Sequence, residues 1–386
     1  MGKSSPSRDW GFSTRALHIG QGPDPATGAV VQPIHMATTF AQQGVGKHKG
    51  FEYGRSGNPT RSALEECLAA LEDARHCLAF SSGLGAETTL MLLLGPGDHV
   101  VYMEDVYGGT FRLFDKVLKR YGLSFTAVDA SDVDRVESAM TDKTRMVWLE
   151  SPTNPLLRIV DIDAVSEVAH SHGAMVCVDN TFATPYLQQP LHLGADVVVH
   201  SATKYLGGHS DVVGGALMTN SDDLEQTLRF HQNAVGAVPS PFDCWLLLRG
   251  VKTLALRVER QCQNAMEVAT ALTRNKNVKR VYYPGLDEHP NRSVAARQMR
   301  LYGGMVSFEV ADEQTAFKTL ERLKIFALAE SLGAVESLAE HPARMTHASI
   351  PPEERRRSGV GDGLIRLSIG VEDVADLVAD LESALG

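Results

Sequence analysis

The hydrophobic and polar positions of this chain alternate between strand-like and helix-like patterns. Short apolar runs typical of buried strands lie at Cys77–Phe80, His99–Met103, Ser124–Ala127, Met146–Leu149, Met175–Val178 and Val197–Val199. Stretches with apolar residues at helical spacing separate them, and residues 61–72 form the first of these. Such alternation predicts an α/β fold in which helices cover both faces of a mostly parallel sheet.

The pattern changes at two places and so predicts three parts. Residues 21–60 are rich in Gly, Pro, Thr and Gln without sustained periodicity, which is unusual inside a compact domain and indicates a functional arm over residues 1–60. After residues 61–250, the expected cofactor-binding domain, a long helix is predicted at Val251–Thr273. Strands predicted at Val278–Tyr283, Met305–Val310 and Leu364–Ile369 make residues 251–386 a smaller α+β domain.

Composition and charge exclude several classes of protein. The formal net charge is −10 and no basic tract offsets it, which argues against a nucleic-acid partner. No apolar stretch is long enough for a membrane span, and the first 20 residues do not resemble a signal peptide. Five widely spaced cysteines without a C-x-x-C pair indicate reduced thiols and no metal site. We therefore expect a cytoplasmic protein.

Polar groups follow the ends of five of the six predicted strands. They lie in the segments Ser81–Ala86, Asp105–Thr110, Glu150–Pro155, Asp179–Thr181 and Ser201–Lys204. Ligands of open α/β sheets bind beyond the carboxyl ends of the strands. The small residues of the first segment suit a phosphate at a helix start, Tyr107 suits a flat ring, and Asn154 offers an amide.

Lys204 and Asp179 indicate which cofactor this is. A lysine amine forms a Schiff base with the aldehyde of pyridoxal 5'-phosphate (PLP), and a carboxylate keeps the pyridine nitrogen protonated, so that the ring accepts electrons. Ser201 and Thr203 are placed to hydrogen-bond the phosphate. A lone lysine is usually a solvated surface residue, so the prediction depends on its companions. The main alternative, a dinucleotide site, lacks support because residues 82–87 miss the third glycine of G-x-G-x-x-G.

Over nearly its whole length the chain resembles the Cys/Met-metabolism family of PLP enzymes, the cystathionine γ-lyase and γ-synthase group. The motifs that carry the resemblance are Tyr53–Thr60, Asp105–Thr110, Pro152–Pro155, Val178–Phe182, Ser201–Lys204, Gly208–Val213, Ala329–Gly333, Met345–Ser349 and Leu364–Gly370. The resemblance implies fold type I and a homotetramer made of two closely joined dimers.

The resemblance also implies roles for particular residues. Tyr53 and Arg55 would reach across the dimer interface to the neighbour's cofactor phosphate, which would explain the arm. The implied cofactor-binding residues are Tyr53, Arg55, Gly83, Leu84, Asn154, Asp179, Thr181, Ser201, Thr203 and Lys204. The implied substrate-binding residues are Tyr107, Arg112, Glu330, Ser331 and Arg366, with Lys204 and Tyr107 catalytic. Without the resemblance, Arg366 is equally well interpreted as an exposed ion-pair partner.

The reaction is less closely specified than the cofactor. The first expectation is cystathionine γ-lyase, which converts cystathionine to cysteine, 2-oxobutyrate and ammonia. The alternative is cystathionine γ-synthase, which replaces the acyl group of O-succinyl- or O-acetylhomoserine by cysteine, and a remote alternative is a PLP-binding regulator without turnover. Glu330 fits both cystathionine enzymes because a carboxylate there can meet a distal ammonium. The balance of β- and γ-elimination stays open, and His35, which departs from the family pattern, either faces the site entrance or caps a turn.

Overall fold

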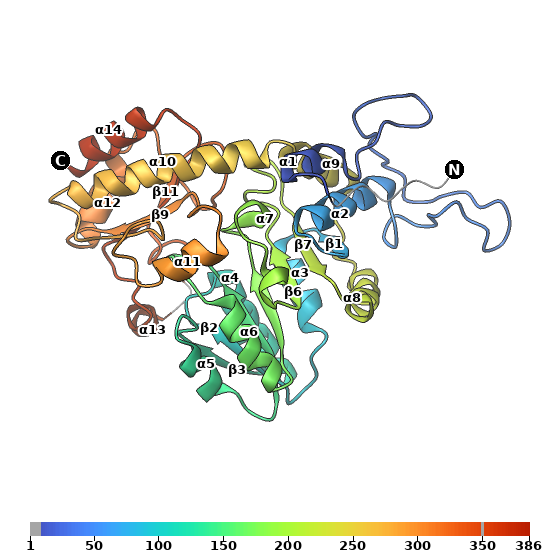
Figure 1. Ribbon diagram of the computed structural model, residues 1–386, viewed down its shortest axis with the longest axis horizontal. Coiled ribbons are helices and arrows are strands. Elements are labelled where there is room, and N and C mark those ends of the chain that lie inside the picture. The colour runs from blue at the N-terminus through green and yellow to red at the C-terminus, as the bar shows by residue number, and fades with distance from the viewer. Residues whose placement is uncertain (1–8, 349–350) are drawn as a thin grey trace. The chain divides into compact units, whose positions relative to one another are not determined.

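In the computed structural model, which describes residues 9–348 and 351–386, helices and strands alternate through most of the chain (Figure 1). The strands are β1 His76–Phe80, β2 His99–Met103, β3 Ser124–Val128, β4 Thr144–Glu150, β5 Met175–Asp179, β6 Val197–His200, β7 Gly215–Thr219, β8 Arg280–Tyr282, β9 Met305–Glu309, β10 Ala327–Leu328, β11 Leu338–Glu340 and β12 Leu364–Ser368. The helices are α1 Phe12–His18, α2 Pro59–Leu71, α3 Gly83–Met91, α4 Gly108–Arg112, α5 Val133–Ala139, α6 Ile162–Ser171, α7 Thr184–Leu187, α8 Asp222–Val235, α9 Pro241–Val251, α10 Leu254–Arg274, α11 Arg292–Gln298, α12 Glu313–Arg322, α13 Pro352–Arg357 and α14 Val374–Leu385.

The first seven strands form one sheet in the order β1-β7-β6-β5-β4-β2-β3. The pairings of β2 with β3, β2 with β4 and β4 with β5 are parallel, whereas β7 runs antiparallel to both β1 and β6. The strands predicted from apolar runs are confirmed, with shifts of one or two residues at their ends. The predicted α/β class with a mostly parallel sheet is therefore correct.

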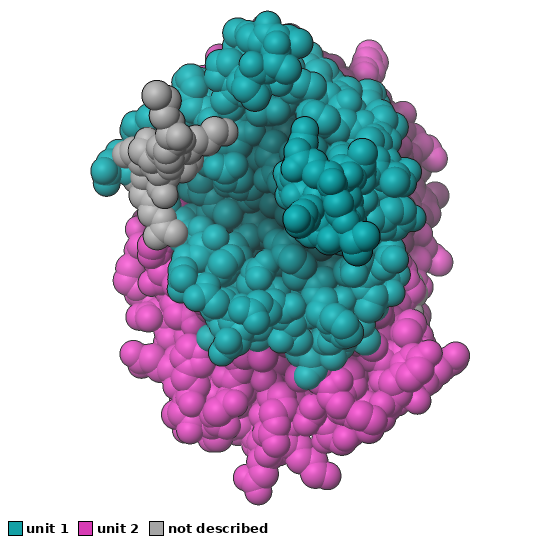
Figure 2. Space-filling view, turned by 90° about the vertical axis from the view of Figure 1, so that its right-hand side faces the viewer, with its two compact units in different colours: residues 1–93, 196–255 teal, residues 94–195, 256–386 magenta. Residues whose placement is uncertain are grey.

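The chain divides into two compact units, which Figure 2 colours separately. Unit 1 comprises residues 1–93 and 196–255, and unit 2 comprises residues 94–195 and 256–386. Both units combine segments that are distant in sequence. The three parts predicted from sequence are a different division, and their boundaries stay a prediction.

The arm of unit 1 has almost no regular structure after α1. Between α1 and α2 the only bridge among the described residues joins Thr39 to Tyr53, and the chain runs as long loops that project from α1 and α2 (Figure 1). These loops border a hollow in the surface of unit 1 (Figure 2). The arm is tied to the start of α2, where the Thr60 hydroxyl accepts the His35 amide at 3.0 Å and the Asn58 side chain donates to the His35 carbonyl at 2.7 Å. The His35 side chain is exposed, so only its backbone takes part in this anchor.

Unit 2 contains the second sheet, in the order β10-β11-β12-β9-β8. Helices α10, α12 and α14 lie along this sheet (Figure 1), and their apolar faces meet those of β9 and β12 in one core that includes Ala265, Phe308 and Leu377. The helix predicted from Val251 begins instead at Leu254, because α9 ends at Val251 and the chain turns with Thr253 bonded to the Gly250 carbonyl. Among the described residues no helix is both long and apolar enough to cross a membrane.

Candidate active site

The Lys204 loop begins where β6 ends. Four buried residues of β6, Val197–His200, lead into Ser201, and the Lys204 amide donates to the Ser201 carbonyl at 3.1 Å. The Thr203 hydroxyl donates to the Gly214 carbonyl at 3.1 Å and accepts from the Gly214 amide at 3.0 Å. These bonds tie the loop to the residue that precedes β7. Lys204 itself is half-buried, which does not fit a solvated surface lysine.

The predicted phosphate cradle lies beside this loop in unit 1. Helix α3 begins at Gly83, and its N-cap Ser82 accepts the Gly85 amide at 3.0 Å. A Cβ at Gly83 would lie 3.1 Å from Ser201, so this glycine allows the helix start and the Ser201 segment to approach closely. The first amides of a helix attract an anion. Gly83, which Leu84 follows, thus lies against Ser201 at the first turn of α3, and a role of these residues toward a phosphate stays a prediction.

Tyr53 and Arg55 lie on the arm and remain at the surface of the single chain. Tyr53 is 49% exposed, and the Arg55 guanidinium lies 5.7 Å from its ring centroid. Arg55 also donates to the Asn233 side chain of α8 at 2.9 Å. Both side chains are therefore presented outward from unit 1.

Unit 2 presents Tyr107 on the loop between β2 and α4. The Tyr107 amide donates to Glu150, the last residue of β4, at 2.9 Å, and the ring is 37% exposed. A Cβ at Gly109 would lie 2.3 Å from the Tyr107 ring, and one at Gly108 would lie 2.4 Å from the Thr346 carbonyl. A side chain at position 108 would collide with backbone, and one at position 109 would force the Tyr107 ring to move. This is the room that the sequence predicted for an aromatic ring ready to stack on a flat ligand.

Asp179 and Asn154 also occupy strand ends of unit 2. Asp179 ends β5, is buried and accepts the amide of the equally buried Thr181 at 3.0 Å. Asn154 follows β4 and is 2% exposed. Its side-chain oxygen accepts Nη1 of Arg366 at 2.9 Å, which leaves the amide nitrogen of Asn154 as a donor for another group.

Arg366, in the middle of β12, is held through the two terminal nitrogens of its guanidinium, Nη1 and Nη2. Nη1 contacts both Asn154 and Glu340, whose Oε1 lies 3.0 Å away, and Nη2 donates to the Ser331 carbonyl at 2.8 Å. Arg366 is 2% exposed, yet its Nε has no hydrogen-bond partner among the described residues. A buried donor without a partner is costly. The Nε–Nη2 edge is thus available to a carboxylate in the bidentate geometry that a guanidinium favours.

Ser331 and Glu330 lie next to this guanidinium. Ser331 has φ +91°, a conformation rare for residues with a side chain, and its carbonyl faces Arg366. Strained backbone of this kind clusters at functional sites. Glu330 is exposed and makes no ion pair within the described part of the chain. Arg112, at the end of α4, is exposed as well, and no contact of this structure assigns it a role.

Sequence reasoning missed the polar network behind the Asn154 loop. Asp105 is buried and accepts the Thr153 hydroxyl at 2.6 Å, while Thr153 and Arg158 close the loop by two bonds of 3.0 Å. Burial raises the pKa of Asp105 to about 6, against the opposing effects of Arg158 and Thr153. On the other side His347 contacts the Asn154 carbonyl at 3.2 Å. The signal available in the sequence was an acid two residues after a buried strand, in the same motif as Tyr107. The last residue of the Met345–Ser349 motif lies outside the described residues.

The family model of the Cys/Met metabolism PLP-dependent enzymes matches residues 13–386. The chain belongs to this family. It is therefore a PLP-dependent enzyme of Cys/Met metabolism, which confirms the predicted family, enzyme class and cofactor.

Relatives of this PLP-dependent enzyme carry three different names at similar identity. It is 55% identical over 377 residues to a cystathionine β-lyase of Coxiella burnetii, 53% over 378 residues to a cystathionine γ-lyase of Dictyostelium discoideum, and 55% over 379 residues to a cystathionine γ-synthase of Mycobacterium tuberculosis. Each of these alignments covers 97% of both chains. The enzyme thus belongs to the transsulfuration group, within which these names do not favour one reaction.

Solved structures agree with this assignment. A crystal structure of metB from Corynebacterium glutamicum superposes with a TM-score of 0.96 at 49% identity and 98% coverage of both chains. A cystathionine γ-lyase from Lactobacillus plantarum in complex with L-serine gives 0.94 at 48% identity, with 97% of this chain and 98% of that chain covered. The predicted fold type I is confirmed.

The residues present suit PLP. Unit 1 supplies a half-buried lysine and a glycine-lined helix start, and unit 2 supplies a buried carboxylate, an aromatic ring and an amide donor. Lys204, Ser201 and the start of α3 would hold the aldehyde and phosphate ends, and Asp179 would hold the ring nitrogen. These individual roles are proposals, to which the tests below are directed.

Proposed function

We propose that this PLP enzyme is a cystathionine γ-lyase, which eliminates cysteine from cystathionine and yields 2-oxobutyrate and ammonia. The observation that carries the proposal is that a guanidinium with an open edge, Arg366, and an exposed carboxylate, Glu330, both adjoin Ser331. The open Nε–Nη2 edge of Arg366 fits the α-carboxylate of an amino acid, and the exposed Glu330 stands one residue from the Ser331 carbonyl that contacts Arg366. An amino acid with a second, distal ammonium satisfies both groups, and cystathionine is such a substrate.

Each proposed residue has a definite task in this reaction. The bound cofactor withdraws electrons from the substrate α-carbon. Lys204 would hold the cofactor and would accept the substrate α-proton as general base. Arg366 fixes the carboxylate and so the orientation of the α-carbon, and Tyr107 is positioned to exchange a proton with the departing sulfur. Asp179, buried at the end of β5, would supply the negative charge that keeps the pyridine nitrogen of the cofactor protonated.

Cystathionine γ-synthase is the second candidate function. Its support is the 55% identity to the mycobacterial γ-synthase and the close match to metB. Glu330 suits this reaction too, because the incoming cysteine also carries an ammonium. A cystathionine β-lyase, the name of the Coxiella relative, breaks the other carbon–sulfur bond of the same substrate.

Product analysis separates the three reactions. The holoenzyme is incubated with cystathionine alone, and separately with O-succinylhomoserine or O-acetylhomoserine plus cysteine. A γ-lyase gives cysteine and 2-oxobutyrate from cystathionine, a β-lyase gives homocysteine and pyruvate, and a γ-synthase gives cystathionine from the acylated homoserine. If the specificity constant for cystathionine cleavage to cysteine is lower than that of either other reaction, the γ-lyase proposal is wrong.

We further propose that the active site is shared between two copies of the chain in a homotetramer. The support is the projecting arm, which exposes apolar side chains at Val30, Val31, Met36 and Val45, as well as Tyr53 beside Arg55. A monomer rarely leaves so many apolar residues uncovered in one segment. Inactive Arg55→Ala and Lys204→Ala proteins should regain activity when mixed, because hybrid dimers contain one site with both native residues. Demonstrated subunit exchange without recovery refutes the shared site.

A further inference from the structure

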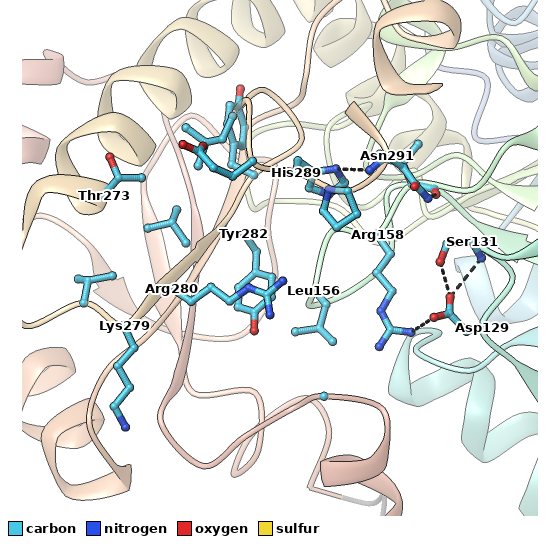
Figure 3. A pocket seen from close by; sticks show the side chains of 18 residues that line it. Asp129, Ser131, Leu156, Arg158, Thr273, Lys279, Arg280, Tyr282, His289 and Asn291 are labelled. Atoms are coloured by element: carbon cyan, nitrogen blue, oxygen red, sulfur yellow. Dashed lines mark hydrogen bonds and ion pairs between the residues drawn. The ribbon is translucent and has the colours of Figure 1, made fainter. Parts of the chain in front are cut away.

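Unit 2 contains a cavity of about 590 Å³ to which no role has been assigned above (Figure 3). Its walls come from the edge strand β8, the loop that follows it to Asn291, and the segment from Leu156 to Ile159. None of the predicted active-site residues lines it. Its volume lies within the range of about 300–1,000 Å³ that is usual for small-molecule sites.

One wall of the cavity is apolar. Val278, Val281 and Leu286 line it and are only partly buried against the core of the second sheet. Leu156 and Tyr282 continue this wall and belong to a second small apolar cluster. Partly exposed aliphatic and aromatic side chains around a concave space favour a ligand with an apolar body.

The charged groups at the cavity differ in how they are engaged. Arg158 contacts Glu104 at 2.8 Å and Asp129 at 3.2 Å, so its charge is balanced within the protein. Lys279 donates to the Ala311 carbonyl at 2.8 Å and points away from the other labelled side chains (Figure 3). The partner of the neighbouring Arg280 is an aromatic ring.

Arg280 is exposed and stacks on the ring of Tyr282, with 4.7 Å between its guanidinium carbon and the ring centroid. The Arg280 side chain makes no ion pair or hydrogen bond among the described residues. The Tyr282 hydroxyl is held by Glu309 at 2.7 Å, which fixes the ring on which the guanidinium rests. The stack thus fixes a cation at the mouth of the cavity and leaves its donors directed to solvent.

His289 adds hydrogen-bonding capacity without charge. Its Nε2 lies 3.0 Å from the Leu157 carbonyl, and Nδ1 accepts the Asn291 amide at 3.3 Å. Burial lowers the pKa of His289, so the ring is neutral at pH 7. His289 thus offers hydrogen bonds without charge, next to the exposed carboxylate of Glu288 and the Arg158–Asp129 ion pair, which also line the cavity. Of the lining cations, Arg280 is the exposed one whose guanidinium is left for a ligand carboxylate.

We propose that this cavity binds a small organic carboxylate with an apolar or aromatic body, with the carboxylate on Arg280 and the body against Val281, Leu286 and Tyr282. A planar guanidinium binds a carboxylate through paired hydrogen bonds, and the stack on Tyr282 reduces the conformational freedom lost on binding. The site is separate from the reaction proposed above and does not depend on which transsulfuration reaction the enzyme catalyses.

The probe for this site is 3-phenylpropionate, titrated into the holoenzyme by calorimetry or ligand-observed NMR. Its uncharged amide, 3-phenylpropionamide, and acetate, which lacks the body, should each bind at least about tenfold more weakly, since a charge-assisted bond or a buried ring contributes that much. Arg280→Gln should weaken 3-phenylpropionate by about tenfold or more. Lys279→Gln removes the same charge one residue away and should change the affinity less than about threefold.

Three results would overturn the proposal. The first is no saturable binding of 3-phenylpropionate, and the second is an affinity that Arg280→Gln leaves unchanged, which would place the carboxylate elsewhere, for example on Arg366. The third is an equal loss in both variants, which would indicate general electrostatic attraction. Because the two changed side chains are exposed, both variants should fold, and unchanged cystathionine turnover in each confirms this.

Discussion

Arg366→Lys is the substitution that most directly tests how the enzyme binds its substrate. The guanidinium of Arg366 holds Asn154 and Glu340 through Nη1 and the Ser331 carbonyl through Nη2, and it keeps Nε open. A lysine retains a positive charge opposite Glu340 but cannot reach all these groups or offer two parallel donors to a carboxylate.

The expected loss follows from the contacts that lysine cannot replace. Two hydrogen bonds to the substrate carboxylate are lost, each worth about 1.5–3 kcal/mol when charged groups are involved. Because the retained ammonium recovers part of this, we expect a loss of about 2–4 kcal/mol, or roughly 30- to 1000-fold in kcat/KM. The carboxylate is bound in the ground state and in the transition state alike, so the loss should fall mainly on KM.

The assay is steady-state turnover of cystathionine, with bound PLP quantified in each preparation. Arg344→Lys is the matched control, because Arg344 makes a bidentate contact with Glu313 at 2.6 and 3.1 Å but lies at the surface of the same unit. Exposed ion pairs contribute little, so this control should change kcat/KM less than about twofold. If Arg366→Lys costs less than about threefold with full cofactor content, Arg366 does not bind the carboxylate.

Three further predictions concern the cofactor, the substrate and pH. Borohydride reduction of the yellow holoenzyme should fix the cofactor to the peptide containing Lys204, and a label on any other lysine would refute the assignment. Lys204→Ala should reduce turnover by several orders of magnitude. Glu330 is exposed in the free enzyme, and we expect bound cystathionine to cover it and form a partly buried charge pair. Glu330→Ala should then lower kcat/KM for cystathionine by roughly 30- to 1000-fold and for homocysteine much less. An equal, small effect on both substrates would show that Glu330 stays a solvated charge. Burial and then the Arg366 charge lower the pKa of His347 to about 4, so the unfolded chain binds more protons than the folded one between about pH 6.5 and 4. The free energy of unfolding, measured by urea titration, should therefore fall between pH 7 and 5 by about 2 kcal/mol more in the native enzyme than in His347→Gln. His172 is exposed, so the control variant His172→Gln should show the same pH dependence as the native enzyme.

The sequence by itself determined the sheet, the cofactor and the family. Strands such as β4 and β6 are buried on both faces, so they appear as short apolar runs that need no knowledge of their neighbours. The groups that PLP requires follow the ends of such strands, and Asp179 and Lys204 were found for this reason. The sequence also indicated the room for the Tyr107 ring, since Gly109 has no Cβ to collide with it.

Only the tertiary structure decided what surrounds these residues. Arg366 and Asn154 are 212 positions apart, and no local pattern reveals that their side chains meet, that Glu340 joins them, or that Nε of Arg366 stays open. The same holds for the stack of Arg280 on Tyr282. From the sequence, β8 can be recognised only as a short strand, and nothing in it reveals this contact. Periodicity reports which face of an element is buried, whereas hydrogen-bond partners depend on how distant elements pack, and that information arises only when the chain folds.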